Sequence, residues 1–319
     1  MGLNASPSLS DSPADRDADF GRVLSGINAS ASPKGNPLTN LRSETIPFDL
    51  DRSTRDEIAR FLAEAALAAG PAVMEEYGRG GVRSKEDGSP VTVADHRAEA
   101  IICAYMARVV PSTPLVAEEL TAAGVPICVA ERFILVDPLD GTREFISGNG
   151  EFTINVALIA GGYPIAGAVY APAIGRLWIG GDHAYLCAAP VGEELAQLSP
   201  QRIKTRAAPS DLIALASRSH RDTATDAFLN RLPVADCRSA GSSLKFCVIA
   251  EGAGDVYPRF APTMEWDTAA GDAVLRAAGG VVVDRTRRPL AYGKFEDRLR
   301  NGAFVAWGDA EAAKRFGYC

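Results

Sequence analysis

The stretch FILVDPLDGTR, residues 133–143, is the most informative part of this chain. Its first four residues are apolar and predict a short buried strand, and Asp137 and Asp140 follow at the carboxyl end, where ligands collect in α/β sheets. Pro138 restricts the backbone between the two acids, and Gly141 permits a sharp turn into the next segment. Two carboxylates on such a turn repel each other unless a cation lies between them, and all-oxygen ligation favours Mg²⁺.

Further acidic residues stand at comparable junctions of the predicted elements. Glu118 and Glu119 follow an apolar run at residues 115–117, and Asp95 and Asp267 stand near the starts of predicted helices, where the helix dipole favours an anion. Taken singly, each is explained as a helix cap or a solvated loop acid. Because all of them fall at strand ends or helix starts, the alternative is that folding gathers them into one cation-binding pocket.

The elements predicted before residue 200 are two helices followed by short strands. A helix is predicted to begin near residue 53, where Thr54 and Glu57 have capping-box spacing, and Gly70-Pro71 should kink or split it. A second helix is predicted from Asp95 to a point before Pro111. Short strands are then expected at residues 115–117, 133–136, 152–159, 165–171, 177–179 and 184–187. Turns rich in Gly, Pro and Asp separate the last four and predict a meandering sheet.

Strands and helices alternate from residue 212 onward. The strands are predicted at 212–216, 255–259, 281–283 and 304–307, and the helices at 224–231, 242–251 and 268–278. We therefore predict an α/β (α+β layered) fold in which helix, sheet, helix, sheet and helix form successive layers.

Three parts are predicted along the chain. Ser, Pro, Gly, Asp and Asn supply 23 of the first 40 residues, so residues 1–48 are predicted to be a disordered or loosely attached tail. Residues 49–200 are expected to form an α+β half that carries most of the acidic motifs, and residues 201–319 an α/β half that completes the site.

Composition and charge exclude several classes of protein. The chain has 319 residues, 47% of them hydrophobic, with 33 basic and 40 acidic residues, which gives a net charge of −7. This balance argues against non-specific binding to nucleic acid or to an anionic membrane, but it permits a small anionic substrate. The six cysteines lack metal-ligand spacing and suggest reduced thiols. No apolar run approaches 18 residues, and the N-terminus has no signal-peptide layout, so a cytosolic protein is expected.

Taken together, the acidic motifs resemble the inositol-monophosphatase superfamily. DPLDGT at 137–142 is preceded by AEE at 117–119 and followed by WDTAAG at 266–271, in the order and at the separations of that superfamily, over about residues 53–310. Other segments resemble the bacterial 3′(2′),5′-bisphosphate nucleotidases of the CysQ type, with Arg143 where lysine is frequent. These segments are KEDGSPVTVAD at 85–95, NGEFT at 149–153, SRSH at 217–220, GSSLKFCVIAEG at 241–252 and YPRF at 257–260.

The resemblance implies a layered fold of the inositol monophosphatase/fructose-bisphosphatase type and a lithium-sensitive phosphomonoesterase with two or three Mg²⁺ ions. It implies hydrolysis of the 3′-phosphate of 3′-phosphoadenosine 5′-phosphate to AMP and phosphate, in sulfur metabolism. A monomer or homodimer in the cytoplasm is implied, with no nucleic-acid partner and no integral membrane segment, and peripheral attachment to the inner membrane is left open.

The resemblance also implies the metal ligands by motif position. They are Glu118, Asp137, the backbone carbonyl of Leu139, Asp140 and Asp267. Two metal ions can stabilise both the attacking and the departing oxygen of a phosphomonoester, so acidic ligands are the side chains that this chemistry needs.

Water activation is assigned in the same way to Asp95 and Thr142, with Glu118 as a competing base. The amides of Gly141 and Thr142 are expected to face the phosphate, as donors do at a turn entering a helix. The alternative for Thr142 is a plain helix cap.

The nucleoside and its second phosphate are expected to contact His220, Ser242, Lys245 and Arg259. A second phosphate lies away from the metals and needs a fixed cationic partner. The alternatives are solvated surface charges for Lys245 and Arg259 and an ordinary loop residue for His220.

Two rival functions remain open from the sequence. One is another phosphatase of the superfamily, acting on inositol phosphates, histidinol phosphate or fructose bisphosphate. The other is a non-catalytic module with one structural Ca²⁺, against which Asp95 and Thr142 argue because metal retention needs neither. The sequence also leaves open the resting metal occupancy, the role of the tail, and the preference between 3′-phosphoadenosine 5′-phosphate and its 5′-phosphosulfate relative.

Overall fold

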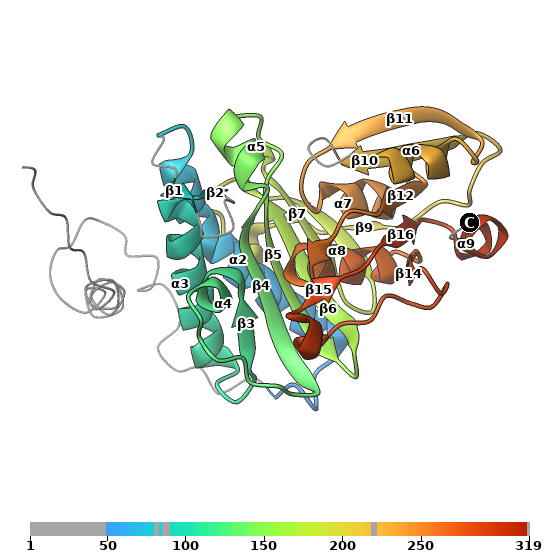
Figure 1. Cartoon of the computed structure of the whole chain (residues 1–319). Helices are drawn as coiled ribbons and strands as arrows, with labels where there is room; N and C mark the ends of the chain where they lie inside the picture. Colours follow the sequence, from blue (N-terminus) through green and yellow to red (C-terminus); the bar gives the residue numbers. More distant parts are fainter. Residues whose placement is uncertain (1–48, 80–82, 85–89, 218–221, 318–319) are drawn as a thin grey trace, which may run out of the picture. The chain divides into compact units, whose positions relative to one another are not determined.

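The computed structural model describes residues 49–79, 83–84, 90–217 and 222–317 (Figure 1). These residues all belong to one compact unit that spans residues 45–319. The predicted tail at 1–48 and His220 lie outside the described residues. In the part of the chain that is described, no helix combines the length and the apolar character needed to cross a membrane.

A seven-stranded sheet carries the first half of the described chain. Its strands follow chain order, with β3 parallel to β4 and each later neighbouring pair antiparallel, so the predicted meander is confirmed. The strands are β3 (Leu115–Ala117), β4 (Arg132–Asp140), β5 (Thr153–Ala160), β6 (Tyr163–Ala171), β7 (Arg176–Gly180), β8 (Ala184–Ala188) and β9 (Gln201–Ile203).

Helices cover both faces of this sheet. Alternate residues of β6 point to opposite faces. Tyr170 meets Gly70 of α2, where a Cβ atom would lie 2.5 Å from the tyrosine ring, whereas Gly167 meets Ala270 of α8 on the other face. Helix α3 packs beside α2. The helices are α2 (Arg55–Glu76), α3 (Val93–Val109) and α8 (Trp266–Ala277).

A second sheet has the strand order β11-β10-β12-β16-β14, in which β10 runs parallel to both of its neighbours. Its strands are β10 (Leu212–Ser217), β11 (Val234–Ala240), β12 (Val256–Arg259), β14 (Val281–Asp284) and β16 (Phe304–Trp307). The remaining helices are α4 (Glu118–Ala122), α5 (Thr142–Ser147), α6 (Thr223–Leu229), α7 (Leu244–Ala250) and α9 (Ala310–Phe316). Short elements complete the description: β1 (Arg83–Ser84), β2 (Pro90–Val91), β13 (Thr263–Met264), β15 (Arg300–Asn301) and the 3₁₀ turns Pro172–Ile174, Leu195–Gln197 and Phe295–Asp297.

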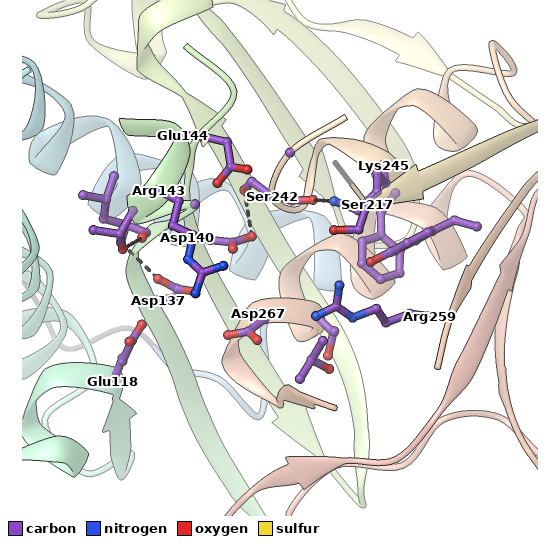
Figure 2. A pocket seen from close by; sticks show the side chains of 18 residues that line it. Glu118, Asp137, Asp140, Arg143, Glu144, Ser217, Ser242, Lys245, Arg259 and Asp267 are labelled. Atoms are coloured by element: carbon purple, nitrogen blue, oxygen red, sulfur yellow. Dashed lines mark hydrogen bonds between the residues drawn. The ribbon is translucent and has the colours of Figure 1, made fainter. Parts of the chain in front are cut away.

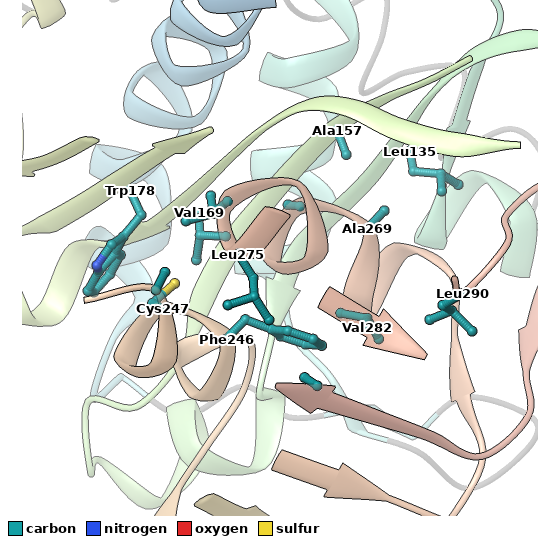
Figure 3. Packing of buried hydrophobic residues seen from close by; sticks show 14 of the residues in the cluster. Leu135, Ala157, Val169, Trp178, Phe246, Cys247, Ala269, Leu275, Val282 and Leu290 are labelled. Atoms are coloured by element: carbon teal, nitrogen blue, oxygen red, sulfur yellow. The ribbon is translucent and has the colours of Figure 1, made fainter. Parts of the chain in front are cut away.

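Two hydrophobic cores of the described residues lie on the two sides of the second sheet. The larger core joins the first sheet to the second through α7 and α8, and in Figure 3 Val169 and Trp178 of the first sheet lie beside Phe246 and Leu275 of these helices. The smaller core lies on the other side of the second sheet and includes residues of α6 and α9. The order helix, sheet, helix, sheet, helix is therefore confirmed. The division into halves at residue 200 stays a prediction.

The predicted split of the first helix at Gly70-Pro71 is wrong, and the kink given as its alternative stays a prediction. A single helix runs over Arg55–Glu76 with Pro71 inside it, and it begins with the expected capping box at Thr54 and Glu57. Proline removes one backbone hydrogen bond, at a cost of about 3 kcal/mol. The helix buries residues along its length, from Ile58 to Val73, so packing outweighs this local cost.

Strand β11 is absent from the sequence-based prediction. Its residues, VADCRSA, are mostly exposed and carry no alternating apolar pattern. The strand lies at the edge of the second sheet, where pairing with β10 alone holds it. Edge strands need little apolar surface, so periodicity does not detect them.

Candidate active site

A pocket of about 260 Å³ is lined by residues of sequence motifs that lie far apart in the chain (Figure 2). Its lining includes most of the predicted site residues: Glu118, Asp137, Leu139, Asp140, Gly141, Thr142, Ser242, Lys245, Arg259 and Asp267. Asp95 lies behind Thr142, within hydrogen-bonding distance of it. The described residues thus bring together all of the predicted site except His220.

The DPLDGT motif forms an irregular strand end and a tight turn. Strand β4 pairs regularly with β5 as far as Asp137, and the register then shifts before Asp140. The carboxylate of Asp137 accepts the amide of Leu139 at 3.0 Å, and Gly141 adopts the left-handed region at φ +91° as the N-cap of α5. The sequence prediction of a turn at Gly141 is confirmed, and the irregularity turns both acids toward the pocket.

Burial and nearby negative charge raise the pKa of two acids in the pocket, Asp137 and Asp267. Asp137 is almost wholly buried, and burial is the main reason why its pKa lies well above the ordinary value, followed by repulsion from Glu118, Asp140 and Asp267. Burial also raises the pKa of Asp267, with repulsion from Asp140 and Glu118 adding to it. A divalent cation bound among them would remove this repulsion.

The donor set suits a hard cation. The predicted ligands are oxygen atoms, four carboxylates and the carbonyl of Leu139, which is the chemistry that Mg²⁺ prefers. In this conformation, no three His, Cys, Asp or Glu side chains of the described residues are grouped tightly enough to hold an ion. The acids nevertheless line one pocket, so a shared ion would require their side chains to move closer together.

Asp95 and Thr142 form the predicted pair. The Thr142 hydroxyl lies 3.5 Å from Oδ1 of Asp95 and 3.3 Å from the carbonyl oxygen of Leu139. Oδ2 of Asp95 accepts the amide of Thr92 at 2.8 Å and its hydroxyl at 2.7 Å, in a capping box. Asp95 therefore caps a helix and faces Thr142 with different oxygens. The helix begins at Val93 rather than at the predicted Asp95, because this box places Asp95 at its third position.

The plain-cap alternative for Thr142 is wrong, since Gly141 is the N-cap of α5 and no side-chain cap hydrogen bond is formed there.

Asp140 is held by a cluster of hydroxyl and amide donors. Its Oδ2 accepts the Ser242 hydroxyl at 2.7 Å, the Ser243 hydroxyl at 3.2 Å and the Asn155 amide at 3.4 Å. The Ser243 hydroxyl also lies 2.8 Å from the carbonyl oxygen of Asp267. These hydrogen bonds connect the loop before α7 to Asp140 and Asp267, two of the predicted ligands. The sequence analysis did not identify Ser243 and Asn155, and only the GSS motif itself could have pointed to Ser243.

Lys245 is a buried cation on the side of the pocket away from Glu118 and Asp137. Its ammonium donates to the carbonyl oxygens of Ala240 at 3.1 Å and Ser242 at 2.5 Å, and it lies 5.1 Å from the centre of the Tyr257 ring. Burial lowers its pKa to about 8, although Asp140 acts in the opposite direction. The surface-charge alternative is wrong for Lys245, which is only 3% exposed.

Arg259 is a second buried cation beside Lys245. It is 8% exposed and donates to the carbonyl oxygens of Ala261 at 3.1 Å and Pro262 at 3.4 Å. Its charge contributes to the lowered pKa of Lys245. The surface-charge alternative is wrong here as well, and two buried cations lie at one end of the pocket.

Several lining residues were not identified from the sequence. Tyr257 could have been found, because it stands two positions before Arg259 on one strand and therefore shares its face. Arg143 follows Thr142 directly. The other unpredicted lining residues are Glu144, Ser217, Gly241, Phe246, Thr263 and Thr268.

Comparison with known proteins identifies the family. The model of the inositol monophosphatase family matches residues 54–312. The chain belongs to this family. A relative from Escherichia coli O157:H7 named 3′(2′),5′-bisphosphate nucleotidase CysQ is 41% identical over 248 residues, covering 77% of this chain and 98% of the relative. The relative of the same name from Buchnera aphidicola is 38% identical over 235 residues, covering 72% of this chain and 86% of the relative.

Solved structures of the family agree with the layered fold. CysQ from Bacteroides thetaiotaomicron, described as a bacterial member of the inositol monophosphatase family, has a TM-score of 0.67 and 36% identity, covering 79% of this chain and 97% of that one. An inositol monophosphatase from Thermotoga maritima has a TM-score of 0.65 at 21% identity, covering 82% of this chain and 96% of that one, and it supports the fold alone.

Proposed function

We propose that this member of the inositol monophosphatase family is a Mg²⁺-dependent 3′(2′),5′-bisphosphate nucleotidase. In this reaction, water cleaves the 3′-phosphate of 3′-phosphoadenosine 5′-phosphate, and the products are AMP and inorganic phosphate. The CysQ relatives carry the same name for their activity, and one of them is 41% identical over 248 residues.

The observation that carries the proposal is the charge distribution of the pocket. Figure 2 shows Glu118 and Asp137 on one side of the pocket and buried Lys245 and Arg259 on the other, with Asp140 and Asp267 between them. A substrate with two phosphate groups matches this arrangement, since one phosphate can approach cations held by the acids while the second meets the buried cations. An inositol monophosphate has no second phosphate for the cationic end.

The proposed metal ligands are the carboxylates of Glu118, Asp137, Asp140 and Asp267 and the carbonyl oxygen of Leu139. When bound, the ions supply positive charge to the phosphate oxygens and to the departing alkoxide. Hydrogen bonds from the cluster around Asp140 engage its Oδ2, which leaves Oδ1 as the oxygen available to a cation.

Asp95 and Thr142 are proposed to activate the attacking water. The hydroxyl of Thr142 can donate its proton to Asp95 while its oxygen accepts one from the water, which makes Asp95 the final proton acceptor. Glu118 remains the competing base. The amides of Gly141 and Thr142 at the start of α5 are proposed to donate to the phosphate.

Ser242, Lys245 and Arg259 are proposed to recognise the second phosphate. The ammonium of Lys245 donates hydrogen bonds to two backbone carbonyl oxygens, so its position is fixed before a ligand binds. Such a preformed site avoids the entropy cost of ordering a long side chain on binding. The predicted contact of His220 lies outside the described residues.

Phosphate release measured across a substrate panel tests the proposal. With Mg²⁺ present, we expect turnover of 3′-phosphoadenosine 5′-phosphate to exceed that of inositol 1-phosphate, histidinol phosphate and fructose 1,6-bisphosphate. The 5′-phosphosulfate relative belongs in the same panel. Faster turnover of inositol 1-phosphate would replace the nucleotidase assignment with the other phosphatase of the superfamily, and absence of turnover would favour a binding module.

The metal requirement is tested in the same assay. Removal of Mg²⁺ with a chelator should abolish phosphate release, and Li⁺ titrated against Mg²⁺ should inhibit it. Activity that is unchanged by both treatments would contradict the proposed metal site.

A further inference from the structure

Glu99 stands on α3 four residues after Asp95, so both side chains occupy one face of the helix. It is buried, with 3% of its surface exposed. Its Oε2 accepts the amide of Glu119 at 2.7 Å, and its Oε1 accepts the amide of Leu120 at 2.8 Å. Both carboxylate oxygens of Glu99 are thus engaged at the start of α4.

These two amides lie in the first turn of α4, where backbone amides have no hydrogen-bond acceptor within the helix. The first amides of a helix have no partner in the helix, and the side chain of the N-cap residue normally accepts one at the second or third position. The N-cap of α4 is Ala117, which has no acceptor and makes no side-chain cap hydrogen bond. Glu99, on α3, supplies the hydrogen-bond acceptors that Ala117 lacks.

The capped turn carries Glu118. Glu118 is the first residue of α4, directly before the two amides that Glu99 holds, and it lines the pocket. Figure 2 shows it projecting from α4 toward Asp137. The direction of its side chain depends on the backbone of this turn, since α4 is only five residues long.

We infer that Glu99 is a positioning residue for metal binding, acting through the first turn of α4 to aim the Glu118 carboxylate into the pocket. Helix α3 then places two parts of the site at once: Asp95 beside Thr142, and Glu118 through Glu99. This inference rests on the metal role of Glu118 in the proposed function. Partners in the shell outside the ligands hold ligands in the orientation that a metal needs.

Mn²⁺ binding to the full chain tests the inference without relying on activity. Loss of the free-ion signal in electron paramagnetic resonance gives the dissociation constant. Replacement of an outer-shell partner costs about 10- to 100-fold in metal affinity. We therefore expect Glu99→Ala to weaken Mn²⁺ binding about tenfold or more. Glu99→Gln should have a smaller effect because its carbonyl oxygen still accepts one amide, and it carries the test if Glu99→Ala does not fold.

A double-mutant cycle with Glu118→Ala separates positioning from general damage. If Glu99 acts through Glu118, Glu99→Ala should have no further effect on Mn²⁺ affinity in the Glu118→Ala background. Equal losses in both backgrounds would overturn the inference. If Glu118→Ala weakens Mn²⁺ binding and Glu99→Ala does not, the inference alone fails. If Glu118→Ala changes nothing, the proposed metal role of Glu118 fails together with the inference.

Asp255→Asn provides a matched control. Asp255 is another buried carboxylate that accepts a backbone amide, that of Ile213 at 2.7 Å, but it lies outside the pocket lining. We expect this variant to lower the melting temperature and to leave Mn²⁺ affinity unchanged. An equal loss of Mn²⁺ affinity in Asp255→Asn would show that the Glu99 effect is a general one and would overturn the inference.

Discussion

Asp95 illustrates how one side chain can serve structure and chemistry with separate atoms. One oxygen completes the capping box of α3 with Thr92, and the other faces the hydroxyl of Thr142. Helix cap and catalytic base are therefore compatible roles for this one side chain. The proposed base is held in position by the bonds that cap the helix.

We expect Asp95→Asn to reduce kcat by about 100-fold or more, because an amide cannot accept the proton and general-base catalysis contributes about 10²–10⁴-fold. The unfolding free energy should fall by about 1 kcal/mol through the weakened cap. Steady-state kinetics and urea denaturation measure the two effects. Glu57→Gln alters the capping box of α2 and should change stability alone. Full turnover by Asp95→Asn would transfer the base role to Glu118.

Lys245 predicts a pH dependence of nucleotide binding. Burial, together with the charge of Arg259, lowers the pKa of its ammonium to about 8 against the opposing effect of Asp140, Glu144 and Glu151. The ammonium is charged below that pH and neutral above it. Affinity for the bisphosphate should therefore fall as pH rises, by about tenfold between pH 7 and pH 9, as the charged fraction falls.

Equilibrium dialysis with the slow Asp95→Asn variant measures this binding without turnover. In Lys245→Arg the affinity should vary little over this range, because arginine stays charged. Binding of 3′-AMP, which lacks the second phosphate, should be nearly flat in both variants. A slope that persists in Lys245→Arg would assign the titration to another group.

At the scale of an element, helix α8 shows how the proposed ligand Asp267 is placed. The helix lies so close to the first sheet that a Cβ atom on Gly180 would be 2.5 Å from Cα of Val274, and one on Gly167 would be 2.8 Å from Cβ of Ala273. These glycines let the helix backbone approach β6 and β7. The close approach determines how deeply Asp267 enters the site from the start of α8.

Gly180→Ala should therefore destabilise the protein by about 1–3 kcal/mol, because the contacted atoms are backbone atoms that cannot move aside cheaply. Thermal and urea unfolding measure the change. Gly302→Ala is the matched control, since a Cβ atom there would have no neighbour within 4 Å. If the two variants were equally stable, the close approach of α8 to the sheet would be in doubt.

At the scale of the whole molecule, the family match begins at residue 54 and the compact unit at residue 45. All proposed site residues lie after that point. We expect a chain that starts at Thr45 to keep kcat/KM within about twofold of the full chain, since no proposed ligand or catalytic group is removed. Activity assays and melting curves of the two chains test this. A large loss of activity would give the first 44 residues a role in the site.

Much of the architecture was predictable because it depends on local patterns. Short apolar runs separated by turns rich in Gly, Pro and Asp indicated the meander of the first sheet, and the capping box at Thr54 marked the start of α2. Where packing overrides local preference, prediction failed. Pro71 is accommodated within a helix buried along its length, and the exposed edge strand β11 has no apolar pattern to reveal it.

By itself, the amino-acid sequence determined the layered fold class and the acidic motifs, because local patterns of residue types encode both, and the resemblance of those motifs to a known family indicated the family. Only the tertiary structure decided which cations are buried, which donors surround Asp140, and that Glu99 caps the turn bearing Glu118. Such contacts join residues far apart in the chain, 103 positions in the case of Ser243 and Asp140. They arise from the packing of layers, which no local pattern records.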